Sequence, residues 1–150
     1  MERFNEFIDI LSGADFDVTA TPKEVEKFIK ENLYKDEFVE RLFHSIIPIQ
    51  RFKLLFPISS YDEFPPQEFE FRSNNGVKPS ELFELISNFY NTKLTPEQID
   101  LYNSLGYDLN FKGIYLHPNF KGFTISHVVP QYVSGLQETA EESAYLLKLD

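Results

Sequence analysis

The chain has 150 residues, 42% of them hydrophobic, and its 24 acidic and 14 basic side chains give a formal net charge of −10 at pH 7. This length and apolar content are typical of one folded domain, while the lack of cysteine excludes disulfides, thiolate metal sites and cysteine nucleophiles. The negative charge disfavours nucleic acid and anionic lipid as partners, because both would repel it, and favours a basic partner.

The sequence carries no signal for secretion or membrane insertion. Met1 is followed by Glu2 and Arg3 and then by an amphipathic pattern, with no apolar signal region. The longest apolar stretches fall far short of the roughly 18 residues that a membrane span needs. We therefore expect a cytoplasmic protein that does not bind a membrane.

Residues 1–47 have the apolar spacing of three helices. The first spans Phe4–Leu11, and the second begins at Thr21 with a proline at its first position and a capping-box glutamate, Glu24. Asp36 is expected to cap the third, which runs until Pro48 stops the pattern.

Two segments that follow, 51–56 and 68–72, alternate between apolar and polar residues as half-buried strands do. We expect them to pair antiparallel, across an irregular proline-containing connection. Such pairing would place opposite charges together on the solvent face, and these are Arg51, Lys53, Glu68 and Glu70.

The second half of the chain predicts a helical hairpin, two strands and a final helix. The hairpin helices cover 79–90 and 95–105, the strands 114–117 and 123–129, and the last helix 134–149. Helices and strands are segregated along the chain instead of alternating regularly. The predicted fold is therefore α+β, with helices packed on a small, mostly antiparallel sheet, in a single domain over residues 1–150.

Motifs for common chemistries are missing from the sequence. None of its six glycines forms a phosphate-binding loop, and the hydrolase elbow G-x-S-x-G does not occur. His117 and His127, with Tyr115 nearby, form the one cluster of acid–base residue types. This pattern favours a protein without catalytic residues, cofactor or bound metal over an enzyme.

The proline-rich connection supplies the best candidate site. It combines acids with aromatic side chains that can anchor a partner at low entropic cost, and acids on the next strand extend it. The candidate partner-binding residues are Tyr61, Asp62, Glu63, Phe64, Glu68 and Glu70.

We interpret the sequence as that of a non-enzymatic acidic binding protein that docks a basic protein partner, such as an immunity or antitoxin-type inhibitor of a cationic toxin. Two alternatives stay open. One is an enzyme or small-ligand protein with a pocket near His117 and His127. The other is a structural subunit of a homo-oligomer, in which phenylalanines form the interface and the charge serves solubility.

Overall fold

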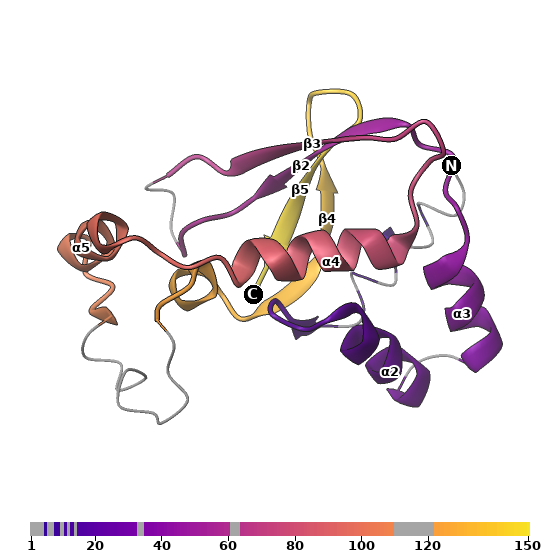
Figure 1. Ribbon diagram of the computed structural model, residues 1–150, viewed down its shortest axis with the longest axis horizontal. Helices are drawn as coiled ribbons and strands as arrows, with labels where there is room; N and C mark the ends of the chain where they lie inside the picture. Colours follow the sequence, from indigo (N-terminus) through magenta and orange to yellow (C-terminus); the bar gives the residue numbers. More distant parts are fainter. Residues whose placement is uncertain are drawn as a thin grey trace.

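The computed structural model describes residues 5, 8, 9, 11, 13, 15–32, 35–60, 64–109 and 122–150. Within this part of the chain, helices pack against a five-stranded mixed sheet with the strand order β1-β4-β5-β2-β3 (Figure 1). Strands β2 and β5 pair parallel and the other neighbours pair antiparallel. The predicted α+β class and its mostly antiparallel sheet are confirmed.

The described elements have the following bounds. The helices are α2 (Pro22–Asn32), α3 (Asp36–His44), α4 (Pro79–Tyr90) and α5 (Pro96–Ser104), with a 3₁₀ turn, η3, at Ile125–Val128. The strands are β1 (Phe16–Asp17), β2 (Arg51–Phe56), β3 (Gln67–Arg72), β4 (Tyr132–Glu138) and β5 (Ala144–Leu149).

The helices predicted in the first part of the chain are present where the chain is described. Residues 5, 8, 9, 11 and 13 are helical. Helix α2 begins as expected, because the Thr21 hydroxyl accepts the Glu24 backbone N–H at 3.3 Å. Helix α3 differs at both ends: Asp36 is its first residue and not its cap, and the helix stops at His44, before Pro48.

Strands β2 and β3 pair antiparallel, as predicted. The expected charge pattern is also present on the solvent side of the pair. The Arg51 Nε lies 2.6 Å from the Glu70 carboxylate, and the Lys53 Nζ lies 2.9 Å from the Glu68 carboxylate.

The predicted final helix is wrong, because residues 134–149 lie largely in the antiparallel hairpin of β4 and β5. At the turn, the Thr139 hydroxyl donates to the Ala144 carbonyl oxygen at 3.0 Å, and Ser143 adopts a left-handed φ of +56°. Leu136 and Leu147, which both belong to the predicted helix, are instead cross-strand partners. The helical spacing of the apolar residues is thus coincidental.

Two further expectations need correction. Residues 123–129 do not form a strand: Thr124 instead precedes η3, and its backbone N–H is accepted by the His127 Nδ1 at 2.9 Å. The predicted strand 114–117 lies outside the described residues. Helices α4 and α5 do not form a hairpin, since α5 lies beyond the end of α4 (Figure 1).

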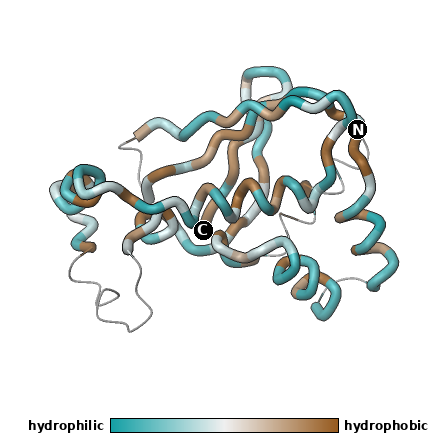
Figure 2. The backbone as a smooth tube through the Cα atoms, viewed as in Figure 1, coloured by the Kyte–Doolittle hydropathy of each residue, from teal (hydrophilic) through white to brown (hydrophobic). Residues whose placement is uncertain are grey.

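The main core lies between the sheet and the helices α2, α3 and α4. Most of β2 and β5 is hydrophobic (Figure 2), as expected for strands at the centre of a sheet. Phe83 of α4 stacks on Phe43 of α3 with ring centroids 5.0 Å apart. A second, smaller cluster joins α5 to η3 and contains Leu94, Tyr102, Leu109, Phe123 and Val128.

Candidate binding groove between β3 and α4

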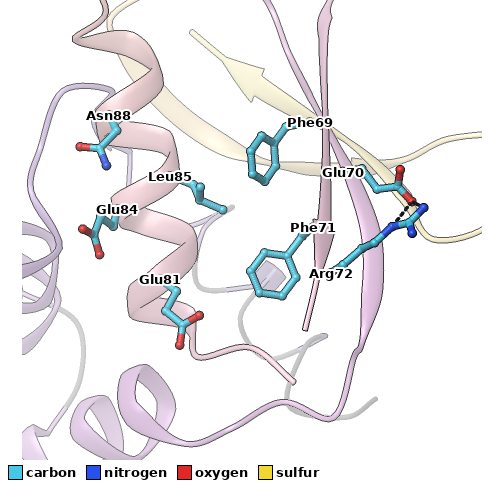
Figure 3. A pocket seen from close by; sticks show the side chains of 8 residues that line it. All are labelled: Phe69, Glu70, Phe71, Arg72, Glu81, Glu84, Leu85 and Asn88. Atoms are coloured by element: carbon cyan, nitrogen blue, oxygen red, sulfur yellow. Dashed lines mark hydrogen bonds and ion pairs between the residues drawn. The ribbon is translucent and has the colours of Figure 1, made fainter. Parts of the chain in front are cut away.

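A groove of about 550 Å³ separates strand β3 from helix α4 (Figure 3). We call it the β3–α4 groove. Its lining residues come from these two elements alone and are Phe69, Glu70, Phe71, Arg72, Glu81, Glu84, Leu85 and Asn88.

The floor of the groove is apolar because of the register between β2 and β3. Phe71 pairs with Phe52 and Phe69 pairs with Leu54, so both rings lie on the sheet face that β2 turns toward the core. Strand β3 is one strand further out, where the helices cover this face less completely. Phe69 is consequently 38% exposed, although Phe52 and Leu54 are buried. Figure 3 shows both phenylalanine rings pointing toward Leu85 of α4.

The helical wall of the groove is acidic. Glu81 and Glu84 are exposed, three residues apart on α4, and form no ion pair or side-chain hydrogen bond with another described residue. Like charges at this spacing cost some tenths of a kcal/mol. The positive end of the helix dipole offsets part of this cost for Glu81, which lies in the first turn. Glu84 lies beyond the first turn and forms no ion pair with a described residue.

The carboxylates of β3 are compensated by basic side chains. Hydrogen bonds from Arg72 and Arg51 hold the pKa of Glu70 below its usual value. Glu68 shares Lys53 with Glu141, whose hydrogen bond contributes most to raising the pKa of that lysine. The two glutamates predicted as site residues thus lie beside the groove. The Glu70 side chain points away from α4 (Figure 3).

The predicted loop residues are only partly described. Tyr61, Asp62 and Glu63 lie outside the described residues. Phe64 packs on α5, with its ring centroid 5.5 Å from that of Tyr102. Of the predicted site residues, the structure therefore places Glu70 in the lining of the groove, Glu68 in the lining of a different pocket and Phe64 in the second hydrophobic cluster.

Sequence reasoning missed the residues that define this groove. Phe69 and Phe71 belong to the predicted half-buried strand 68–72 but not to the candidate site, which also lacks Glu81 and Glu84. The one available signal was the i, i+3 spacing of these two acids at the start of a helix that follows Lys78 and contains no basic residue of its own.

His127 lies at a different, polar pocket of about 400 Å³ between β1 and η3. Asp17 in this pocket accepts the Thr19 hydroxyl at 2.6 Å and the Gln131 side-chain amide at 3.1 Å. Because the His127 Nδ1 accepts a backbone N–H, that ring nitrogen stabilises η3 and is occupied.

The remaining residues of the predicted histidine cluster, Tyr115 and His117, lie outside the described residues. Across the described ranges, no three histidine, aspartate or glutamate side chains gather in a group that could hold a metal ion. No helix in the same ranges is both long and apolar enough to cross a membrane.

No protein family model, curated protein or solved structure matches this chain. On its surface, the β3–α4 groove combines the partly exposed rings of Phe69 and Phe71 with two acids, Glu81 and Glu84, that form no ion pair with a described residue.

Proposed function

We propose that this chain is a non-catalytic binding protein that docks a positively charged protein partner through the β3–α4 groove. The observation that carries the proposal is the pair Glu81 and Glu84, which form no ion pair with a described residue and lie beside the apolar floor of Phe69 and Phe71. A lysine or arginine of a partner would supply the missing charge. Apolar parts of the same partner would cover the phenylalanine rings.

The apolar floor and the acidic wall would contribute differently to binding. Covering Phe69 removes apolar surface from water, which stabilises a complex by about 25 cal/mol per Å². The acidic wall, together with the net charge of −10, accelerates encounter with a basic partner and disfavours acidic ones. Affinity would come mainly from the floor, and selectivity from the wall.

The loop residues Tyr61, Asp62 and Glu63 belong to this proposal as a second contact, because only three residues separate them from the start of β3 along the chain. Glu68 and Glu70 would contribute at the rim, since their charges are already paired. The specific form that we propose is an immunity or antitoxin-type inhibitor that covers the basic active site of a toxin in the cytoplasm.

The experiment is an affinity capture from native lysate at about 50 mM and 500 mM salt, with three forms of the protein as bait. These are the wild type, the groove variant E81K/E84K and the matched control E37K/E40K. Glu37 and Glu40 have the same spacing on α3, form no ion pair with a described residue and do not line the groove. Both double variants change the net charge equally.

The proposal expects the wild type and the α3 control to capture the same basic protein at low salt and to release it at high salt. The groove variant should capture little of it. Equal losses in both double variants would mean that overall charge drives binding and that the groove plays no part. If the wild type captures no basic protein, the proposed function is wrong.

A further inference from the structure

The outer edge of β3 has backbone groups available for pairing with another strand. Among the described residues, β3 ends the sheet and has β2 as its single neighbour. The Ser73 backbone N–H donates to the Gln50 carbonyl oxygen at 2.9 Å. Because antiparallel ladders alternate, Phe71 and Phe69 also bond toward β2, and the backbone N–H and C=O groups of Glu68, Glu70 and Arg72 point outward.

The other side of β2 supports this assignment. The Lys53 backbone N–H donates to the Ser143 carbonyl oxygen at 2.8 Å, in the direction of β5. Lys53 is the β2 partner of Glu70 in the register. Since Lys53 directs its backbone groups away from β3, Glu70 must direct its own toward the free edge.

From this edge and the groove beside it, we propose that the partner binds by strand addition: an extended segment of about six residues pairs with Glu68, Glu70 and Arg72 of β3. This inference rests on the proposed function of the groove and specifies the recognised segment. The main-chain bonds would give affinity, and the alternating side chains would give selectivity.

The side chains of the added strand can be assigned by face. On the groove face they would lie beside Phe69 and Phe71 and opposite the acidic wall of α4, which favours apolar residues alternating with lysine or arginine. On the opposite face three basic and three acidic side chains already neutralise one another, which favours uncharged polar residues there. These six are Arg51, Lys53, Arg72, Glu68, Glu70 and Glu141.

A second copy of this chain is the competing occupant of the edge. Each copy carries a net charge of −10, and pairing of two β3 edges would bring together two acidic walls without supplying a basic partner to either. Charge complementarity therefore favours a basic segment from another protein. The paired charges on β3 also limit indiscriminate edge pairing, as charged edge strands commonly do.

The test uses a synthetic peptide, Ac-Thr-Lys-Thr-Phe-Thr-Lys-Thr-Phe-NH₂, in which lysine and phenylalanine share one face of the extended strand. Two further peptides carry N-methyl groups on the lysine and phenylalanine amides or on the threonine amides. One of these sets would point toward β3 and the other toward water, so strand addition predicts that just one methylated peptide loses binding, by about tenfold or more.

The matched test on the protein compares Glu70→Pro with Glu70→Gln. Both remove the carboxylate charge, but only proline removes the outward N–H. We expect Glu70→Pro to bind the peptide at least about tenfold more weakly than Glu70→Gln, because the two variants share the loss of the rim carboxylate and differ in the N–H group. Circular dichroism melts check that both variants are folded, and the methylated peptides keep the test decisive if Glu70→Pro is not.

Other outcomes overturn the inference in distinguishable ways. If E81K/E84K abolishes peptide binding while both methylated peptides bind like the parent, the groove holds a basic segment without strand pairing, and the proposed function stands. If the peptide does not bind at millimolar concentration, strand addition of such a segment is wrong, whereas the capture experiment still decides the proposed function. A dimer seen by light scattering that Glu70→Pro dissociates would identify a second copy as the occupant.

Discussion

Removing one hydroxyl group, in Tyr90→Phe, tests how the end of α4 is joined to the sheet. Tyr90 is 0% exposed, and its hydroxyl donates to the Pro57 carbonyl oxygen at 2.9 Å, just after β2. Phenylalanine keeps the ring and its contacts and leaves this carbonyl without its partner. A buried polar group without a partner costs about 1–2 kcal/mol of unfolding free energy.

For a chain of this length, 1 kcal/mol corresponds to a fall of about 2–4 °C in Tm. Urea titration at pH 7 measures the difference in unfolding free energy directly. Tyr132→Phe is the matched control, because Tyr132 is 44% exposed and its hydroxyl forms no hydrogen bond with a described residue. The control should change the unfolding free energy by less than about 0.5 kcal/mol.

The same substitution should also change how the free energy of unfolding depends on pH in the alkaline range. Burial raises the pKa of Tyr90, so the folded chain keeps this proton at pH values where the unfolded chain, with a pKa of about 10, loses it. The contribution of this group to stability is complete below pH 10 and falls by about 1.4 kcal/mol per pH unit above it. Phenylalanine has no such dependence, so the stability curves of wild type and variant should cross near about pH 11. A constant difference from pH 7 to pH 11, or a Tyr90→Phe effect as small as the control's, would refute this reasoning.

Two other substitutions test local features of the fold. In urea titrations, Gly76→Ala should lower the free energy of unfolding by clearly more than Gly106→Ala. Both glycines have a positive φ, +82° and +92°. A Cβ at Gly76 would clash with the Ile47 carbonyl oxygen, whereas one at Gly106 would meet nothing within 4 Å. Left-handed strain alone costs about 1–2 kcal/mol, so equal effects would show that the Ile47 contact relaxes freely. Partial burial would raise the pKa of Asp17, but hydrogen bonds from Thr19 hold this pKa below its usual value. The stability that the Asp17 carboxylate contributes is therefore present above about pH 4 and is lost as the pH falls through the lowered pKa. Asp17→Asn should therefore destabilise at pH 7 and have less effect at pH 2–3, and an equal deficit at both pH values would contradict this assignment.

The features that the sequence predicted correctly are those that depend on neighbours along the chain. The helix predicted at 95–105 is one example, because α5 begins with a capping box: the Thr95 hydroxyl accepts the Gln98 backbone N–H at 3.2 Å, and the Gln98 side chain accepts the Thr95 backbone N–H at 2.8 Å. The pairing of β2 with β3 is another, because these strands follow one another in the chain and alternate clearly. Both could be inferred from a few residues at fixed spacing.

The C-terminal hairpin shows why the other elements could not be predicted. Strand β5 lies between β4 and β2, so both of its edges are paired with other strands. Ala144, Tyr145 and Leu147 are all buried, and the alternation that marks a half-exposed strand is missing. Without it, glutamates and alanines with high helix propensity made the segment resemble a helix. The segment forms a strand because it pairs with β2, which is some 90 residues away in sequence.

The groove depends on long-range structure in the same way. Sequence reasoning selected acids by their abundance near exposed aromatics, and it reached Glu68 and Glu70, whose charges the structure shows to be paired with lysine and arginine. A carboxylate can bind a basic partner best when no basic side chain of its own chain is paired with it. Whether Glu84 is paired in this way depends on which strand ends the sheet beside α4. Because β3 is that strand, its phenylalanines are left half covered next to two acids that have no ion pair with a described residue. The strand order therefore determines both the exposed apolar floor and the available strand edge, so a single type of partner segment could use both.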